Sequence, residues 1–279
     1  MEYMRTQKMV IGNRTFAFGE HTYVMGILNV TPDSFSDGGN YVNQQDALRQ
    51  VEKMIKAGVD IIDVGGESTR PGYVQISEAQ EIERVCPVIE KIKTEFDIPV
   101  SLDTYKAQVA QAGVQAGIDM INDIWGLQYD KEMAGVVSKS GLPYVLMHNR
   151  KEIDATGDFF PHVLESFQDS LLIARNAGID ERKIILDPGI GFAKTYEQNL
   201  LLLNKLRELG ELGYPILLGC SRKSVIGLCL DIPVEERLAG TLATTSLAVM
   251  QGCGVVRVHD VKENVETIKM METVLHTKA

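Results

Sequence analysis

The sequence predicts an α/β fold, a (β/α)8 TIM barrel, and three observations lead to that prediction. Eight short apolar runs alternate with amphipathic segments along the chain. The runs are apolar almost without interruption, which is typical of parallel strands buried on both faces. The length of 279 residues suits such a barrel, because this fold takes roughly 250 residues in one domain. We therefore expect residues 1–279 to form a single domain.

The strands and helices can be placed from local signals. The predicted strands are 22–30, 60–65, 99–104, 120–125, 143–149, 183–189, 215–221 and 255–261. Residues 44–58 form a predicted helix that ends at Gly58, a residue typical of helix C-termini. A second helix, 77–93, begins at Ser77 and carries Glu81 in its first turns, which suits the positive end of the helix dipole.

A short hairpin is predicted ahead of the barrel. Residues 9–18 contain two apolar runs about the pair Gly12-Asn13, which tolerates positive φ in a tight turn. We expect this hairpin, within residues 1–20, to cap the N-terminal end of the barrel.

Composition excludes some classes of partner. The net charge is −10 and the isoelectric point is near 5.1, whereas a nucleic-acid-binding face is usually basic. We expect no nucleic-acid partner, although a few basic side chains in a cleft can still bind a small anion. No run of about 18 apolar residues occurs, so we expect no membrane span.

The cysteines and the first residues favour the cytoplasm. The cysteines form no C-x-x-C pair; they are Cys86, Cys220, Cys229 and Cys253. The initial residues MEYMRTQKMV lack the apolar segment of a secretion signal. Reduced thiols in a cytoplasmic protein are therefore expected. The five histidines do not follow zinc-binding spacings.

Polar residues stand where the predicted strands end. They are Asn29, Asp103, Asn122, Asp123, His148, Asn149, Asp187, Ser221, Arg222, Lys223, Arg257 and His259. In a (β/α)8 barrel these ends converge at one mouth, where active sites are built. Asp187, Lys223 and His259 follow one another at intervals of 36 residues, about one β–α unit, so we expect them to be neighbours. So many polar groups in one ring require a ligand to satisfy them.

Two loops after strands have unusual compositions. The first loop, 31–40, is rich in Ser, Asp and Gly yet carries Phe35. The second loop, 65–75, places Arg70 beside hydroxyl residues and before a Pro-Gly pair. An arginine flanked by hydroxyl groups predicts an anion clamp. Loops of this kind often close over a site and exclude water.

Seven segments together resemble the motif set of the dihydropteroate synthases, a family of pterin-binding enzymes. They are NVTPDSFSDGG (29–39), GGESTRPG (65–72), SLDT (101–104), NDI (122–124), LDPGIGF (186–192), SRKS (221–224) and RVHDV (257–261). They follow the order of the family and span nearly the whole chain, and the first two and SRKS are the most specific. The resemblance implies a transferase that condenses 6-hydroxymethyl-7,8-dihydropterin diphosphate with p-aminobenzoate, giving dihydropteroate and diphosphate in folate synthesis.

The resemblance also suggests which residues hold the pterin. A carboxylate can read the guanidine-like edge of the ring in a bidentate manner, and Asp187 is the residue predicted for it. Asn122 offers both a donor and an acceptor, Asp103 is expected at the reduced ring, and Lys223 at a carbonyl or ring nitrogen. The faces of the ring are expected to pack on Met147 and Phe192.

The diphosphate requires cations and hydroxyl groups. The residues expected around it are Ser68, Thr69, Arg70, Arg257, Val258 and His259. Magnesium takes few protein oxygens and keeps several waters, and Asn29 is the single protein ligand expected for Mg²⁺.

The remaining roles concern the second substrate and the chemistry. The p-aminobenzoate pocket, where sulfonamides compete, is expected from Phe35, Ser68, Thr69, Pro71, Lys223 and Ser224, with Asp37 helping to order the closed first loop. The predicted catalytic residues are Asp103, Asp187, Lys223, Arg257 and His259. Loss of diphosphate can precede attack and leave a delocalised cation, which fixed carboxylates stabilise.

Three other readings remain at this point. A methyltetrahydrofolate-type methyltransferase shares the pterin-reading residues but needs no diphosphate clamp, so diphosphate release separates the two. A non-catalytic pterin-binding paralogue is expected to lose clamp residues, and none is missing. Another phosphate-binding barrel enzyme, such as an aldolase, requires a Schiff-base lysine, and Lys223 is not excluded by its chemistry alone.

One helix bears on assembly. Residues 238–250 are apolar or small on nearly all sides, which predicts burial beyond one barrel face. Either the helix lies in the core or it faces a second copy. Since the resembled family usually forms homodimers, a homodimer is expected.

Overall fold

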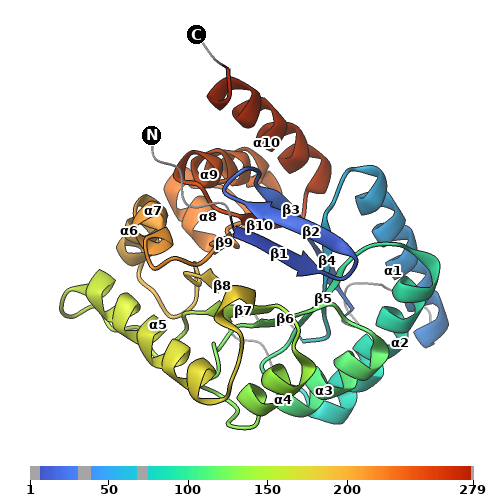
Figure 1. Ribbon diagram of the computed structural model, residues 1–279. Coiled ribbons are helices and arrows are strands. Elements are labelled where there is room, and N and C mark those ends of the chain that lie inside the picture. Colours follow the sequence, from blue (N-terminus) through green and yellow to red (C-terminus); the bar gives the residue numbers. More distant parts are fainter. Residues whose placement is uncertain (1–6, 31–38, 68–74, 278–279) are drawn as a thin grey trace.

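The computed structural model describes residues 7–30, 39–67 and 75–277, and within 39–43 only the backbone. Figure 1 shows strands at the centre and helices around them. Within the described residues, eight parallel strands pair in the order β8-β7-β6-β5-β4-β3-β10-β9. A further parallel bridge between Leu186 and Ile216 connects β8 to the chain just before β9. The sheet is therefore closed, and the predicted barrel is confirmed.

The strands are shorter than the apolar runs that predicted them. They are β3 (Tyr23–Asn29), β4 (Ile61–Gly65), β5 (Val100–Asp103), β6 (Met120–Asp123), β7 (Tyr144–Met147), β8 (Ile184–Asp187), β9 (Leu217–Leu218) and β10 (Val255–Val258). The run 215–221 contributes only the two residues of β9. The flanking residues leave the ladder because they continue into the loops at either end of the barrel.

Helices cover the outside of the barrel. They are α1 (Gly39–Lys56), α2 (Glu78–Glu95), α3 (Ala107–Ala116), α4 (Met133–Ser140), α5 (Phe159–Asn176), α6 (Tyr196–Asn204), α7 (Leu206–Gly210), α8 (Ser224–Leu230), α9 (Leu238–Gln251) and α10 (Val261–Leu275), with short 3₁₀ helices at Glu181–Lys183 and Val234–Glu236. Helix α1 starts at Gly39, five residues before the predicted start, so it takes up the end of the predicted first loop.

The local signals around α2 act as expected. Ser77 is its N-cap, and the Ser77 hydroxyl accepts from the Gln80 backbone N–H while the Gln80 side chain accepts from the Ser77 N–H. This reciprocal capping box satisfies two backbone donors that the helix itself leaves open. Glu81, which was expected to face the helix dipole, is almost fully buried and has a specific partner, described below.

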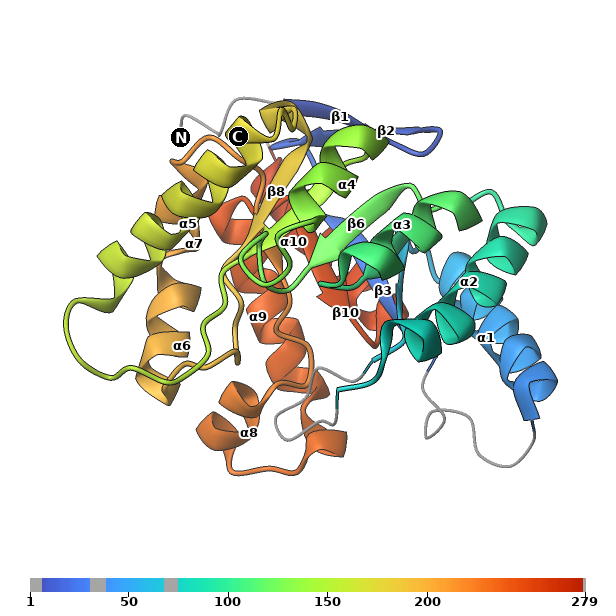
Figure 2. The ribbon, with the colours of Figure 1, turned by 90° about the horizontal axis from the view of Figure 1, so that it is seen from below.

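The hairpin closes one end of the barrel. Strands β1 (Gln7–Ile11) and β2 (Arg14–Phe18) pair antiparallel about Gly12-Asn13, and only Gly12 of the two has positive φ, at 60°. Their apolar side chains pack on the first residues of the barrel strands in one buried cluster: Met9, Ile11, Phe16, Phe18, Met25, Ile61, Met120, Val145, Ile185, Leu217 and Val255. Figure 2 shows the hairpin at the end opposite α8. The predicted cap is confirmed.

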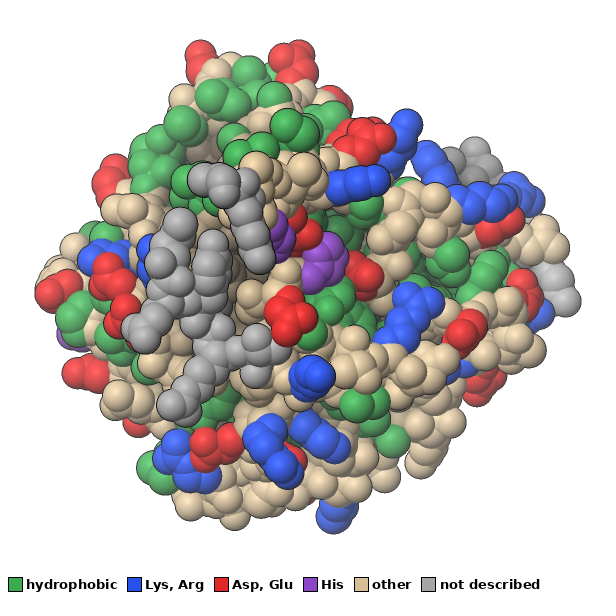
Figure 3. Space-filling model, turned by 45° about the horizontal axis from the view of Figure 1, so that its top comes forward, with side chains coloured by type: hydrophobic (Ala, Val, Ile, Leu, Met, Phe, Trp, Pro, Cys, Tyr) green, Lys and Arg blue, Asp and Glu red, His purple; other side chains and the backbone are tan. Residues whose placement is uncertain are grey.

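The surface carries both signs of charge. On the described part of the face in Figure 3, acidic and basic side chains are intermingled rather than gathered by sign. None of the helices in the described ranges is long and apolar enough to cross a membrane.

Candidate active site

The interior of the barrel changes from apolar to polar towards one end. Successive side chains of a strand point to opposite faces, so a residue two positions after an interior residue also faces the interior. The pairs are Ile61 and Asp63, Met120 and Asn122, Val145 and Met147, Ile185 and Asp187, and Val255 and Arg257. The first member of each pair lies in the capped apolar layer, so the second members form a layer nearer the mouth.

The same alternation removes two predicted residues from the mouth. Asp123 follows the interior Asn122 and points outward, where it accepts hydrogen bonds from Tyr144 Oη and from the N–H groups of Trp125 and Leu127. His148 follows Met147 and packs beside Phe159, and burial lowers the pKa of His148 to about 2. The prediction that every polar strand end joins one ring was wrong for these two.

An ion network crosses the polar layer. Arg257 Nε donates to Asp63 Oδ2 at 2.6 Å, and Arg257 Nη2 donates to Asp103 Oδ2, also at 2.6 Å. Asn122 Nδ2 donates to the same Asp63 oxygen at 3.1 Å. Strands β4, β5, β6 and β10 are therefore joined through their side chains as well as through the sheet. The network brings the predicted Asp103, Asn122 and Arg257 together.

Two carboxylate oxygens in this network have no protein partner. Within the described residues, Asp63 Oδ1 and Asp103 Oδ1 are buried and make no hydrogen bond. A buried acceptor left without a donor costs about 1–3 kcal/mol. A ligand that brings N–H groups to this layer removes that cost, so the layer is suited to a donor-rich ligand.

Burial and charge shift the pKa values of the network in opposite directions. Burial raises the pKa of Asp103 to about 7, against the lowering effect of Arg257 and with a further rise from Asp63. For Arg257, burial lowers the pKa, but the carboxylates of Asp63 and Asp103 outweigh it and raise the pKa above its usual range. Arg257 therefore stays cationic, whereas Asp103 changes its charge near neutral pH.

Asp187, Lys223 and Arg257 converge on one glycine. A Cβ atom built on Gly219 lies 3.7 Å from Asp187 Oδ2, 3.7 Å from Lys223 Nζ and 4.0 Å from Arg257 Cβ. The three side chains therefore meet beside Gly219. The predicted proximity of Asp187 and Lys223, taken from their sequence interval, is confirmed.

The loop after β8 holds Asp187 and Lys223 in place. Asp187 Oδ1 accepts the Gly189 N–H at 2.7 Å, and Lys223 Nζ donates to the Ile190 carbonyl. Burial raises the pKa of Asp187 and Lys223 opposes this rise. Burial lowers the pKa of Lys223, against the effect of Asp187. Burial and mutual attraction therefore act in opposite directions on the charge of each group.

An apolar wall flanks the charged groups. Tyr105, Ile124 and Met147 form a buried cluster, against which Trp125 and Phe192 pack. Lys223 Nζ lies 4.7 Å from the centroid of the Phe192 ring, so the wall and the charges meet. Met147 and Phe192, predicted to pack on a flat ring, lie together here.

Three more predicted residues lie at or just after the end of β10 and at the start of α8. His259 is fixed at the rim, where its Nδ1 lies 3.0 Å from Ser221 Oγ and its backbone N–H donates to the same oxygen. The side chain of Val258 is buried in the core between sheet and helices. Ser224 is the first residue of α8 and is exposed.

The loop residues are not placed. Phe35, Asp37, Ser68, Thr69, Arg70 and Pro71 lie outside the described residues. Asn29, the predicted magnesium ligand, is the last residue of β3 and pairs in register with Gly65, which in turn pairs with Asp103. Most of the predicted residues at the strand ends are therefore placed around one mouth, and the predicted roles of the loop residues stay predictions.

Sequence reasoning missed Asp63 and Lys194. Asp63 is fully buried inside the barrel, and the available signal was an Asp within the apolar run DIIDVG, since a buried carboxylate requires a partner. Lys194 Nζ donates to the carbonyl oxygens of His148, Gly189 and Phe192 at 3.2, 2.8 and 2.9 Å. Nothing local in the sequence shows that this lysine turns inward to bind three loop carbonyls.

Known proteins resemble this chain over nearly its full length. The family model described as pterin binding enzyme matches residues 25–259. A dihydropteroate synthase of Clostridium beijerinckii is 54% identical over 268 residues, which cover 96% of this chain and 99% of that enzyme.

Two solved structures resemble the fold closely. The dihydropteroate synthase of Yersinia pestis with a sulfonamide drug gives a TM-score of 0.91 at 40% identity, covering 97% of this chain and all of the other. The enzyme of Xanthomonas albilineans with 4-aminobenzoic acid gives 0.93 at 37% identity, covering 98% and 100%.

The fold and its charged mouth are those of a (β/α)8-barrel enzyme with a polar layer suited to a donor-rich ligand. The comparisons make that class specific. The chain belongs to the pterin-binding enzyme family and, within it, to the dihydropteroate synthase group. The resemblance seen in the motifs is confirmed, and the methyltransferase and non-catalytic readings are not favoured.

Proposed function

We propose that this chain condenses 6-hydroxymethyl-7,8-dihydropterin diphosphate with p-aminobenzoate, giving 7,8-dihydropteroate and diphosphate in folate synthesis. The observation that carries the proposal is the convergence of Asp187, Lys223 and Arg257 around Gly219. These three lie beside the Asp63, Asp103 and Asn122 network. Chains named for this activity match nearly the full length.

The polar layer fits a pterin ring. The ring has an edge of N–H donors beside a carbonyl, and the layer offers carboxylate oxygens with Lys223 as a donor. Asp187 Oδ1 is occupied by the Gly189 N–H, so Oδ2, which points to the space at Gly219, is the oxygen for the ligand. Asp103 Oδ1 is a second acceptor awaiting a donor. Met147 and Phe192 supply the apolar surface for the faces of the ring.

The chain's own groups then account for the reaction. The C–O bond to diphosphate breaks and its electron pair leaves with the diphosphate, so positive charge spreads over the dihydropterin. The carboxylates of Asp103 and Asp187 stabilise that charge because they are fixed before it develops. The aryl nitrogen attacks the CH2 carbon, a C–N bond forms, and the nitrogen then loses a proton. The amine is neutral at pH 7, so a strong base is unnecessary.

Magnesium is proposed as the cofactor. The amide oxygen of Asn29 is a hard oxygen ligand of the kind that Mg²⁺ takes beside substrate phosphates. A Cβ on Gly65 would lie 3.6 Å from Asn29 Oδ1 and 3.8 Å from Asp103 Oδ2, so both oxygens lie on the same side of Gly65. When bound, the ion neutralises charge on the leaving diphosphate. Ser68, Thr69, Arg70 and His259 are proposed as further diphosphate contacts.

The second substrate is proposed to bind beside Lys223 and Ser224. Phe35, Ser68, Thr69 and Pro71 complete that pocket in the proposal, and Asp37 helps to order the first loop. We extend sulfonamide competition to this chain because the Yersinia pestis relative was solved with a sulfonamide drug. A Phe35→Ala variant is expected to raise the KM for p-aminobenzoate more than the KM for the pterin substrate.

A homodimer is proposed as the assembly. Thr241, Thr245, Ala248 and Val249 of α9 are buried, and the other residues of this helix are half-buried or exposed. Apolar side chains on α8, α9 and α10 are more than 45% exposed: Leu228, Leu230, Met250, Met270 and Val274. Covering such a surface favours association, and light scattering after size exclusion tests it by mass.

The cytoplasm is proposed as the location. All four cysteines are unpaired. Free thiols suit a reducing compartment, where disulfides rarely persist.

The proposal is tested by incubating the chain with the pterin diphosphate, p-aminobenzoate and Mg²⁺. Dihydropteroate and diphosphate are expected in equal amounts, and an Asp187→Asn variant is expected to lose both together. Release of diphosphate without any dihydropteroate, or no turnover by the folded wild type, contradicts the proposal.

A further inference from the structure

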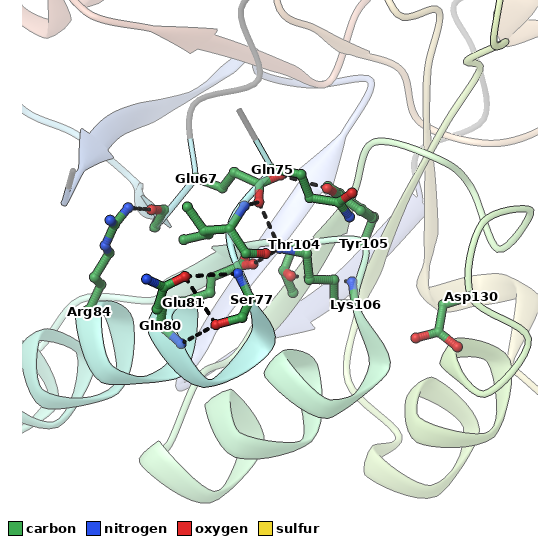
Figure 4. Close-up of polar contacts among 12 residues, drawn as sticks. Glu67, Gln75, Ser77, Gln80, Glu81, Arg84, Thr104, Tyr105, Lys106 and Asp130 are labelled. Carbon is green, nitrogen blue, oxygen red and sulfur yellow. Dashed lines mark hydrogen bonds and ion pairs between the residues drawn. The ribbon is translucent and has the colours of Figure 1, made fainter. Parts of the chain in front are cut away.

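A second group of buried charges lies where the loops after β4 and β5 meet the start of α2 (Figure 4). We call Glu67, Glu81 and Lys106 the Lys106 cluster. Lys106 Nζ lies 2.7 Å from Glu67 Oε2 and 2.7 Å from Glu81 Oε2. The three side chains are only 5%, 3% and 2% exposed for Lys106, Glu67 and Glu81. Two carboxylates therefore share one ammonium group out of contact with water.

The cluster joins two backbone positions that are nine residues apart. Glu67 Oε2 accepts the N–H of Ile76 at 2.9 Å, and Lys106 Nζ donates to the carbonyl of Ile76 at 2.8 Å. Both backbone groups of Ile76 are thus bound by the cluster. Glu67 follows β4, and Ile76 precedes Ser77, the N-cap of α2. Glu67 and Ile76, which flank 68–74 in the sequence, are consequently fixed to each other.

The cluster also connects these ends to the site. Lys106 lies three residues after Asp103, in the loop that follows β5. Its neighbour Tyr105 donates its hydroxyl to Glu67 Oε1 at 2.6 Å, and Tyr105 belongs to the apolar wall with Met147. The ends of the segment are therefore held relative to Asp103 and to the surface proposed for the pterin.

Stability alone does not explain these charges. Burying ions costs several kcal/mol each, and apolar residues of similar size often serve stability equally well. Helix α2 already has a capping box and a buried apolar face that includes Val85, Ile89 and Ile92. Burial lowers the pKa of Lys106, but the two carboxylates outweigh this effect and raise the pKa, so the lysine stays charged. The cluster therefore carries the desolvation cost of buried ions, and it fixes the backbone N–H and carbonyl of Ile76.

We propose that Glu67 and Lys106 are positioning residues of the reaction. They fix Glu67 and Ile76 relative to each other, and these two residues flank the predicted contacts Ser68, Thr69 and Arg70 in the sequence. Their role is proposed to concern the diphosphate and p-aminobenzoate. This inference rests on the proposed function. It assigns the cluster no part in holding the pterin ring, which belongs to Asp187 and Asn122.

The two carboxylates of the cluster provide a matched pair of variants. Glu67→Gln and Glu81→Gln each remove one buried negative charge beside Lys106 and keep the size of the side chain. Only Glu67 also binds Ile76 and Tyr105. A misplacement of about 1 Å costs on the order of 100-fold in rate, so Glu67→Gln is expected to lower kcat/KM for p-aminobenzoate by at least about 10-fold. Glu81→Gln is expected to stay within about 3-fold of the wild type, since it leaves the contacts to Ile76 intact.

A binding measurement separates positioning from general damage. The affinity for 6-hydroxymethylpterin, which lacks the diphosphate, is expected to be unchanged in both variants when followed by calorimetry. Thermal unfolding is measured in parallel. If Glu67→Gln does not fold, Glu67→Asp is used, because it keeps the charge but is one methylene too short to reach both Ile76 and Lys106. The same loss of kcat/KM is expected for it.

The inference is overturned if the two Gln variants lose kcat/KM equally, or if the Glu67 variants keep wild-type kinetics. It is also overturned if hydroxymethylpterin binding falls as much as kcat/KM. Each of these results requires an active wild type, whereas an inactive wild type that still binds the pterin contradicts the proposed function instead. The two failures are therefore distinguishable.

Discussion

Arg257 Nη2 and Asp103 Oδ2 lie 2.6 Å apart and join β10 to β5 across the mouth of the barrel. The two residues are separated by 154 positions in the sequence, and the contact depends on β3 pairing with both β4 and β10. Burial nevertheless raises the pKa of Asp103 to about 7. One carboxylate of the proposed mechanism therefore titrates within the usual assay range.

The activity is expected to depend on pH through Asp103. Because the pKa is raised, the stabilising carboxylate is the minor form below pH 7 and dominates above it. The kcat/KM for the pterin diphosphate should rise through about pH 7 and then level off. Asp103→Asn is expected to lower kcat/KM by about 100-fold and to lose this rise. An Asp103→Asn profile that keeps the same rise assigns the titration to another group.

The free energy of unfolding should fall as pH rises through the pKa of Asp103, whereas the activity rises. The folded-state pKa of Asp103 lies above its ordinary value of 3.8, so the folded state binds the proton more tightly than the unfolded state. The stabilising contribution of protonated Asp103 to the free energy of unfolding is fully present below about pH 4 and is lost as pH rises through about 7. Urea unfolding of the wild type and of Asp103→Asn across this window measures it. A difference between the two that does not change with pH contradicts the expectation.

Removing Arg257 should destabilise the fold. Arg257→Met leaves Asp63 and Asp103 buried without their cation, and breaking a buried pair in this way costs about 3–5 kcal/mol. The free energy of unfolding in urea gives the value. Arg207→Met serves as the control with little change, because the Arg207 side chain donates only to the exposed Met250 carbonyl among the described residues. A loss below about 1 kcal/mol for Arg257→Met shows that the network is solvated.

Pterin binding should depend strongly on Asp187. Asp187→Ala removes the carboxylate whose Oδ2 points to the space at Gly219, and losing one partner of a buried charged contact costs about 2–5 kcal/mol. Calorimetry with hydroxymethylpterin measures the change in affinity. Asp169→Ala, an exposed position on α5, is the matched control. Near wild-type affinity in Asp187→Ala rejects the assigned role.

Much of the fold could be predicted because its signals are local. The hairpin was visible in its turn pair, α2 in Ser77, and the barrel in the alternation of apolar and amphipathic runs. The residues Asp187, Asn122 and Arg257 were found because they stand at strand ends and in motifs. Their meeting at one mouth follows from the parallel order of the strands in the barrel.

What was missed depends on the direction of side chains or on distant partners. Their position at a strand end did not show that Asp123 and His148 face outward. A shift of one residue along a strand moves a side chain from the inside of the barrel to the outside. Asp63 was overlooked within its apolar run. Lys106 meets Glu67 and Glu81 across 39 and 25 positions, and no local pattern links them.

Asn29 should control the requirement for magnesium. Asn29→Ala removes the proposed ligand oxygen, and the Mg²⁺ concentration that gives half-maximal activity is expected to rise by about 10-fold or more. Asn204→Ala, at an exposed position at the end of α6, is the control. Turnover is followed at several fixed Mg²⁺ concentrations with saturating substrates. Identical magnesium curves for both variants assign the metal to other groups.

Lys194 should matter through the loop that it binds rather than through its charge. Its ammonium group donates to the carbonyls of His148, Gly189 and Phe192, so it ties the end of β7 to the loop that carries Phe192. Lys194→Met keeps the length of the side chain but leaves three carbonyls without this donor. Each buried acceptor left without a donor lowers the stability of the fold by about 1–3 kcal/mol. We expect a lower free energy of unfolding and a higher KM for the pterin diphosphate, because Phe192 moves relative to Met147. The KM for p-aminobenzoate should change less. A loss of stability with both KM values unchanged limits Lys194 to a structural role.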